Sequence, residues 1–368
     1  MKILIAPDKF KGSLTAKEVC EAVKTGINRL YPEYRLVELP LADGGEGFSE
    51  AIIGEKSYEK LECLVKDPIG RNLNSHLYII SGKTAIVEMA NASGLNLLSP
   101  QEKNPLKTST FGTGQLINYA IKMKVDEIIV GIGGSATNDA GIGMAAALGY
   151  IFLDENRSEL EPVGENLIKI KYIVEPKLKP WKNVKIKVAC DVSNPLFGFD
   201  GAAYIFAKQK GANDSEIEAL DNGLKHFAKI CSHYFKTDMH TIPGAGAAGG
   251  LGYGLVTFLN AELKSGIDLI LEANDFDEKL VGVDLVITGE GKMDIQTLSG
   301  KVVAGVAKKA KEKKIPVYGI CGISELTDRQ VNELGLKKLA SLKSDNISTE
   351  YAIQNAKELI IERVKQIF

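Results

Sequence analysis

The sequence predicts an α/β protein in which both ends of the chain build one parallel-sheet domain and the middle forms an inserted domain. Its 368 residues correspond to about two domains of ~150 residues each. Short apolar strands alternate with amphipathic helices at both ends, which is typical of a parallel sheet covered on both faces. Neither end has enough strands for a sheet of its own. We therefore expect residues 1–55 and 280–368 to join in one discontinuous domain around a mixed α/β domain at 56–279.

The N-terminal segment is expected to form a β-α-β unit. Residues 2–6 predict a short buried strand, and apolar side chains recur at helical spacing over 14–30. Thr15 and Glu18 have the spacing of a capping box, so the helix should begin at this point. A second strand is expected over 34–41.

The same alternation predicts the elements of the C-terminal segment and of the middle. After the first C-terminal strand, a polar loop is expected over 288–300. The expected C-terminal strands cover 284–287, 316–320 and 339–342, and the expected helices cover 302–313 and 353–364. In the middle, strands are expected over 83–89, 127–130 and 184–190, and helices over 111–123 and 141–148.

Composition and charge exclude several classes of protein. The chain has 45 Lys+Arg and 47 Asp+Glu, a net charge of −2, so it lacks the basic surface of a nucleic-acid-binding protein. No apolar run reaches the ~18 residues of a membrane helix, and the apolar start is too short for a signal peptide. The five cysteines are widely spaced and odd in number, which favours a reducing cytoplasm. We expect a cytoplasmic protein without a nucleic-acid or membrane partner; the oligomeric state is not predicted.

Glycine is unusually abundant and clustered. The chain has 37 glycines in 368 residues, about a tenth, whereas ~7% is typical. Clustered glycine suits sharp turns or the close approach of a ligand to the backbone. Three polar or glycine-rich loops directly follow expected strands, at 7–13, 42–47 and 288–300. Because ligands bind beyond the carboxyl ends of parallel strands, we expect all three loops at one edge of one sheet.

The first of these loops carries cations before a helix. Lys9, Lys11, Gly12 and Ser13 precede the expected helix N-terminus, where backbone N–H groups favour an anion. The alternative is two solvated lysines with Ser13 as a cap.

The other two loops combine carboxylates with glycine. Asp43 is followed by Gly44 and Gly45, and the later loop contains Gly289, Glu290, Lys292 and Asp294. Carboxylate oxygens are suitable ligands for Mg²⁺, and glycine lets the backbone approach phosphate. Either loop alone could be an acidic turn, but together on one sheet edge they favour a metal–phosphate site.

Three further features lie in the middle of the chain. The segment Gly131–Ala136, with Asp154 about twenty residues later, fits the looser form of the dinucleotide-binding fingerprint. The glycine-rich segment 243–252 fits an anion cradle, a hinge or closely packed backbone. Asp191 ends an expected strand and suits a general base, or alternatively caps the turn before Pro195.

Eight ordered motifs resemble those of the bacterial glycerate kinases. They are APDKFKGSL at 6–14, ADGGEG at 42–47, EMANASGL at 88–95, TFGTG at 110–114, GGSATND at 133–139, ACDVSNPLFG at 189–198, PGAGAAGGLG at 243–252 and TGEGKMDIQT at 288–297. The resemblance implies a flavodoxin-like domain built from both chain ends, with an inserted second domain. It also implies ATP and Mg²⁺ as cofactors and phosphorylation of D-glycerate, usually at the 2-hydroxyl.

The resemblance allows roles to be assigned to individual residues. Asp191 is expected to act as base or orienter of the glycerate hydroxyl, and Lys11 to neutralise the transferring phosphoryl group. Asp43 and Asp294 would hold Mg²⁺. The glycerate-binding residues would be Arg71, Asn138 and Asp139, with Arg71 alternatively a surface arginine. The nucleotide-binding residues would be Lys9, Gly12, Ser13, Gly44, Gly45, Gly289, Glu290 and Lys292. We expect the active site in the cleft between the two domains.

Two alternatives belong to other functional classes. An NAD-dependent dehydrogenase would use the Gly131–Ala136 loop and Asp154, but would leave the loops at 42–47 and 288–297 unexplained. A non-catalytic protein that senses a sugar acid or a nucleotide would bind ligand without releasing ADP.

Overall fold

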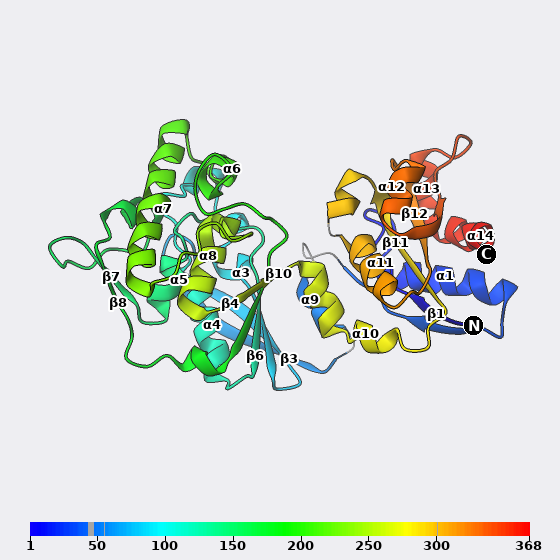
Figure 1. The fold of residues 1–368 in the computed structure, drawn as a ribbon, viewed down its shortest axis with the longest axis horizontal. Helices are drawn as coiled ribbons and strands as arrows, with labels where there is room; N and C mark the ends of the chain where they lie inside the picture. The colour runs from blue at the N-terminus through cyan, green and yellow to red at the C-terminus, as the bar shows by residue number, and fades with distance from the viewer. Residues whose placement is uncertain (43–47, 55, 300) are drawn as a thin grey trace. The chain divides into compact units, whose positions relative to one another are not determined.

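The computed structural model describes residues 1–42, 48–54, 56–299 and 301–368, with side-chain surroundings described for all of these except Ser299. The chain divides into two compact units, drawn in Figure 1. Unit 1 comprises Met1–Gly54 and Gly266–Phe368, and unit 2 comprises Glu55–Ser265. The segment 266–279, which we assigned to the inserted domain from sequence, belongs to unit 1.

Unit 1 contains a five-stranded parallel sheet with the order β13-β12-β11-β1-β2. Its strands are β1 (Lys2–Ile5), β2 (Arg35–Glu38), β11 (Leu285–Met293), β12 (Val317–Ser324) and β13 (Leu336–Ser341). Numbered one to five along the chain, they lie in the order 5-4-3-1-2, which is the flavodoxin-like order read from the opposite edge. The predicted fold class is therefore confirmed.

Strand β11 runs six residues beyond its predicted end. Residues 288–293 were expected to begin a loop, but they pair with β12 as far as Met293 and Ser324. Gly289 explains part of the difference, because a Cβ at this position would lie 2.0 Å from the carbonyl oxygen of Ile320. The glycines that suggested a loop therefore permit close strand pairing, and the loop prediction is wrong over 288–293.

Helices pack on the sheet of unit 1 according to the alternation of its side chains. Ile3 and Ile5 of β1 share a core with α1 (Ala16–Leu30), α13 (Thr349–Gln354) and α14 (Ala356–Ile367), whereas Leu4 lies between them in sequence and points to the other face. Helices α1 and α14 lie side by side although they come from opposite ends of the chain (Figure 1). The remaining helices of the unit are α2 (Phe48–Ile53), α9 (Gly266–Ala273), α10 (Phe276–Lys279), α11 (Val302–Glu312) and α12 (Asp328–Glu333).

Unit 2 is built on a six-stranded mixed sheet with the order β10-β9-β6-β5-β4-β3. The strands are β3 (Tyr58–Lys66), β4 (Asn72–Ile80), β5 (Thr84–Glu88), β6 (Glu127–Gly131), β9 (Lys185–Ala189) and β10 (Glu262–Lys264). A separate two-stranded sheet pairs β7 (Ile151–Leu153) with β8 (Tyr172–Val174). The helices are α3 (Ala90–Ser93), α4 (Phe111–Lys122), α5 (Ile142–Ala147), α6 (Ala202–Phe206), α7 (Asp214–Phe235) and α8 (Ala247–Leu259).

The glycine-rich segment 243–252 is closely packed backbone. Three consecutive residues, 248–250, have left-handed backbone angles, with φ of +68° at Gly249. A Cβ at Gly249 would lie 1.9 Å from the Thr137 carbonyl oxygen, and the Gly249 carbonyl accepts a hydrogen bond from the Ala140 N–H at 3.1 Å. Of the three possibilities left open by the sequence, the structure supports packing against the 137–140 loop.

Two further features complete the description of the fold. No helix in the described parts of the chain combines the length and apolar character required to cross a membrane. All five cysteines are described, and their thiols are free.

The close approach of α1 to α14 predicts a specific stability effect. A Cβ at Gly26 would lie 2.9 Å from Cβ of Val364, so Gly26→Leu should lower the free energy of unfolding by about 1–3 kcal/mol through overpacking. Urea denaturation measures this change. The exposed Lys17→Leu variant on the same helix should stay within about 0.5 kcal/mol of the native chain. An equal loss of unfolding free energy in the two variants would contradict the explanation by overpacking at Gly26.

Candidate functional site

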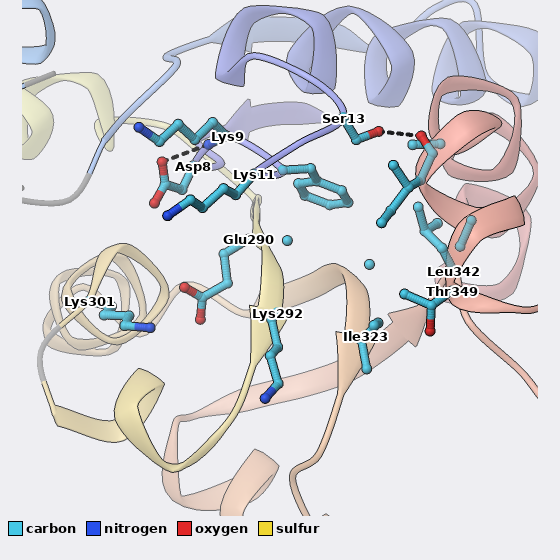
Figure 2. Close-up of a pocket in the computed structure, with 16 residues that line it drawn as sticks. Asp8, Lys9, Lys11, Ser13, Glu290, Lys292, Lys301, Ile323, Leu342 and Thr349 are labelled. Carbon is cyan, nitrogen blue, oxygen red and sulfur yellow. Dashed lines mark hydrogen bonds between the residues drawn. The ribbon is translucent and has the colours of Figure 1, made fainter. Parts of the chain in front are cut away.

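The candidate site lies in unit 1, where the strand order reverses between β1 and β11. Ligands of open α/β sheets bind beyond the carboxyl ends of the strands at such a switch point. A pocket of about 290 Å³ is present there (Figure 2). Its lining comes from the loop after β1, the far part of β11, the ends of β12 and β13, and helices α13 and α14.

The pocket has two chemically different ends. We define its charged end by the side chains Asp8, Lys9, Lys11, Glu290, Lys292 and Lys301. We define its apolar end by Phe10, Ile323, Leu342, Ala352, Ile353 and Ala356. Residues of the 7–13 loop and of the 288–300 segment thus meet at one sheet edge, as expected, although 288–293 belongs to β11 rather than to a loop. Asp43, Gly44 and Gly45 of the third loop lie outside the described residues.

Two buried carboxylates, Asp8 and Glu290, lie at the charged end, with exposed fractions of 6% and 5%. Burial is the main cause that raises the pKa of Glu290 to about 7, and the nearby charge of Asp8 raises it further. The Thr297 hydroxyl donates a hydrogen bond of 2.5 Å to Oε1 of Glu290 and opposes this shift, as does the charge of Lys301. The charged end therefore holds two carboxyl groups that are shielded from water, and burial shifts Glu290 toward its neutral form.

Lysines balance these carboxylates. The backbone N–H of Lys9 donates to Oδ1 of Asp8 at 2.6 Å, which fixes the start of the loop. The Lys11 side chain is exposed, and Figure 2 shows it with Lys9 and Asp8 on one side of the pocket, facing Glu290 and Lys301. Such a ring of cations around carboxylates can bind a phosphate chain together with a divalent cation.

Lys292 and Asp294 form a small ion-pair network at the rim. Nζ of Lys292 lies 2.9 Å from Oε1 of Glu325 and 3.5 Å from Oδ2 of Asp294. The hydrogen bond to Glu325 is the main cause that raises the pKa of Lys292, whereas the Gln296 N–H mainly lowers the pKa of Asp294. Asp294 does not line the pocket, but it is connected to the charged end through Lys292 and through Thr297, whose hydroxyl accepts from the Asp294 N–H at 3.1 Å and donates to Glu290.

The first loop is held by its neighbours rather than by an open helix end. Gly12 adopts a φ of +79°, and the Ser13 hydroxyl donates to the Ile353 carbonyl at 2.6 Å. The predicted capping box is present, because Thr15 and Glu18 satisfy each other's backbone N–H groups. The N–H groups of Thr15 and Glu18 are therefore engaged within the capping box and are not open to an anion.

In unit 2, the 133–139 loop is held by buried polar contacts. Asp139 is fully buried and accepts four hydrogen bonds, from the N–H and hydroxyl of Thr110 and from the N–H groups of Gly141 and Gly143. Burial raises the pKa of Asp139, and these bonds oppose the shift. Neither polar atom of the Asn138 side chain has a partner within the described residues, although the residue is fully buried.

A buried lysine supports the same loop. Nζ of Lys210 donates to the Ser135 hydroxyl at 2.6 Å and to the Thr137 carbonyl at 2.8 Å. Its exposed fraction is 2%, and burial lowers its pKa to about 7, while the charge of Asp139 opposes the shift. Lys210 thus fixes the backbone immediately before Asn138.

Asp191 and Arg71 lie on loops of unit 2. Asp191 is exposed and directly follows β9 and Cys190, as predicted. The Arg71 guanidinium contacts Oδ2 of Asp67 at 2.5 Å and Oε1 of Glu102 at 2.7 Å. Its side chain remains half exposed, but much of its hydrogen-bonding fork is already engaged by these carboxylates.

The dinucleotide interpretation of Gly131–Ala136 is wrong. A dinucleotide fold needs the acidic residue at the end of the next parallel strand of the same sheet. Strand β7 instead pairs with β8, antiparallel and in a separate two-stranded sheet. Oδ1 of Asp154 accepts the N–H groups of Asn156 and Ser158, so this carboxylate closes a turn.

Sequence reasoning missed Asp8, Lys301 and Lys210. Asp8 and Lys301 lie beside residues that were chosen, and the position of Asp8 directly after Pro7 in the first loop could have identified it. Lys210 carries no local signal, because its burial depends on contacts with a loop about 75 residues away.

The charged end is compatible with a magnesium ion shared with a phosphate ligand. Within the described ranges, no group of three or more His, Cys, Asp or Glu side chains is arranged to hold a metal alone. Mg²⁺ commonly uses only one or two carboxylates, with phosphate and water as its other ligands. Asp8 and Glu290 provide two, and a bound cation would favour the charged form of Glu290, whose pKa is raised mainly by burial.

The fold and the pocket define the class of this molecule: an α/β protein with a lysine-rich ligand pocket at the switch point of a flavodoxin-like sheet. Residues 3–368 match a family model that is described as "Glycerate kinase family". The chain is 42% identical to the glycerate kinase of Bacillus subtilis (strain 168), over 100% of this chain and 97% of that relative. The chain therefore belongs to the glycerate kinase family, as the eight motifs indicated.

Two further relatives support this assignment. The glycerate 2-kinase of Escherichia coli (strain K12) is 45% identical over 333 residues, which cover 89% of this chain and 86% of the relative. A solved structure from Salmonella typhimurium LT2, named as a glycerate kinase 2, is similar with a TM-score of 0.86 and 40% identity. The match covers 100% of this chain and 97% of that one.

The buried lysine predicts a pH dependence of stability. Lys210 has a pKa of about 7 in the folded chain and about 10.5 when unfolded, so the unfolded chain binds one more proton between these values. The free energy of unfolding of the native chain should therefore rise with pH in this window, by up to about 1.4 kcal/mol per pH unit. Lys210→Met should lack this contribution in urea denaturation between pH 7 and 9. If the free energy of unfolding depends on pH in the same way in both proteins, Lys210 stays charged in the folded chain.

Proposed function

We propose that this protein transfers the γ-phosphoryl group of ATP to the 2-hydroxyl of D-glycerate in a Mg²⁺-dependent reaction in the cytoplasm. The observation that carries the proposal is the charged end of the pocket, at the switch point of a chain of the glycerate kinase family. The name of the 45% identical Escherichia coli relative, glycerate 2-kinase, supports the choice of hydroxyl. The free thiols support a reducing compartment.

The lysines would bind and neutralise the phosphate chain. Phosphoryl transfer depends mainly on positioning and on charge stabilisation, because the protein has little covalent chemistry to perform. Lys11 is the exposed cation of the first loop, and we assign it to the transferring phosphoryl group. Lys9 and Lys292 would hold the remaining phosphate oxygens, and Gly12 and Gly289 would shape the backbone around them.

Asp8 and Glu290 would hold Mg²⁺ together with the phosphates. The ion, when bound, supplies charge neutralisation for the phosphate oxygens. We retain Asp294 as an outer residue that orients Lys292, since these two side chains are 3.5 Å apart. The proposal for Asp43, Gly44 and Gly45 in the same site continues to rest on the sequence.

The residues proposed to act on glycerate lie in unit 2. We propose that Asp191 takes the proton of the 2-hydroxyl while the bond from that oxygen to the γ-phosphorus forms and the bond from phosphorus to ADP breaks. Arg71 would exchange part of its contact with Glu102 for the glycerate carboxylate. Asn138, with both polar atoms unpartnered among the described residues, would bind a substrate hydroxyl, and Asp139 would position its loop.

Product analysis tests the reaction directly. Incubation with D-glycerate and Mg·ATP should yield ADP and 2-phosphoglycerate, identified by phosphorus NMR. A 3-phosphoglycerate product would overturn the regiochemistry alone. Thermal stabilisation by glycerate or nucleotide without ADP release would indicate the sensing protein instead.

The role of Asp191 predicts a loss of turnover. Asp191→Asn keeps the size of the side chain but removes the base, so kcat should fall by roughly 10²–10⁴-fold. Asp200→Asn, an exposed carboxylate on the same stretch of chain, is the matched control and should keep native activity. A loss below tenfold in a folded Asp191→Asn protein would remove this residue from the role.

A further inference from the structure

We propose that the apolar end of the unit 1 pocket is an adenine subsite, with the nucleotide lying across the pocket toward the charged end. The inference rests on the ATP dependence proposed above. It assigns a function to α13 and α14, which none of the sequence motifs includes.

The composition of the apolar end suits an aromatic base. Phe10, Leu342, Ala352 and Ala356 are buried, with exposed fractions between 1% and 4%, and form a closed wall. Ile353 lines the same pocket but is 44% exposed, so its side chain offers apolar surface that a planar ligand could cover. The small side chains of Ala352 and Ala356 keep this wall shallow, as a flat ring requires.

The middle of the pocket is backbone rather than side chain. Gly291 and Gly322 both line it, and a Cβ at Gly322 would lie 2.5 Å from the Gly291 carbonyl oxygen. A Cβ at Gly291 would lie 3.0 Å from the backbone nitrogen of Lys11. Glycine at both positions lets strands β11 and β12 and the first loop approach closely, and it leaves an uninterrupted path from the apolar to the charged end. A sugar would occupy this path.

The two ends are also mechanically connected. The hydrogen bond from the Ser13 hydroxyl to the Ile353 carbonyl joins the lysine-bearing loop to α13. Thr349, at the start of α13, adds a hydroxyl to the lining beside the apolar wall and can donate to or accept from a ring nitrogen. A pocket of about 290 Å³ with one apolar end and polar groups gathered at the other suits a small ligand that is itself apolar at one end and charged at the other.

Binding measurements with separated parts of the nucleotide test the subsite. Isothermal titration of the full chain with Mg·ADP and with Mg·tripolyphosphate distinguishes base contacts from phosphate contacts. Ile353→Asp places a carboxylate against the base and should weaken Mg·ADP binding at least tenfold while leaving tripolyphosphate binding unchanged. Lys11→Met should weaken both ligands.

Tyr351→Asp is the matched control, because Tyr351 lies on the same helix, is 54% exposed and does not line the pocket. It should bind both ligands as the native chain does. The milder Ile353→Ala variant should weaken Mg·ADP binding by about three- to tenfold through lost apolar contact, and its unfolding midpoint should match that of the control.

Mg·ADP affinity within twofold of native in Ile353→Asp would overturn the subsite. An equal loss of ADP and tripolyphosphate binding would also overturn it, because the substitution would then act through the first loop. Activity of the native protein on D-glycerate is measured on the same preparation. Failure of the proposed function would appear there as absent turnover, whereas failure of the subsite would appear only in the variants.

Discussion

The parallel pairing of β1 with β11 is the interaction on which the candidate site depends. It joins segments about 280 residues apart, with Ile3 opposite Leu285 and Ile5 opposite Ile287. The ladder continues past the end of β1, because the N–H groups of Ala6 and Asp8 donate to the carbonyls of Ile287 and Gly289, each at 2.8 Å. Asp8 and Glu290 are thereby fixed next to each other by backbone hydrogen bonds, before any side-chain contact is made.

The electrostatics of the pocket follow from this placement. Both carboxylates are held out of water; burial is the main cause of the raised pKa of Glu290, and the nearby charge of Asp8 adds to it. The chain compensates with lysines from three different segments rather than with one strong ion pair. A pocket that holds both carboxylates and lysines suits a ligand that combines negative phosphate groups with a positive ion. Phosphate alone would leave the carboxylates without a counter-charge, and a cation alone would leave the lysines without one.

Much of the fold could be predicted from the sequence because its signals are local. The apolar strands at the two ends, the capping box of Thr15 and Glu18, and the helix that begins at Phe111 depend on residues close in sequence. The error at 288–293 has a tertiary cause: only the neighbouring β12 makes these polar residues and glycines a strand. The Asp154 interpretation failed for the same reason, because no spacing rule reveals which sheet a short strand joins.

The charged end of the candidate site could be predicted from the sequence, whereas its apolar end could not. Lys9, Lys11, Ser13, Glu290 and Lys292 were identified from loops after strands, and the structure brings them into one pocket. The apolar end was not predicted, since its residues come from five separate parts of unit 1 and resemble ordinary core positions. Lys210 could not be predicted from the sequence, because its hydrogen-bond partners lie about 75 residues earlier in the chain.

The discontinuous sheet of unit 1 has a consequence for biosynthesis. During translation, β1 and β2 emerge long before their partner β11, and all of unit 2 is made in between. The contacts of unit 2 lie within one continuous stretch of chain, so unit 2 can fold first. Until β11 is synthesised, the edge of β1 that pairs with β11 has no partner strand. The ribosome translates about 250 codons between the end of β2 and the start of β11, and during this time the unpaired strand edge exposes the nascent chain to aggregation, against which chaperones protect.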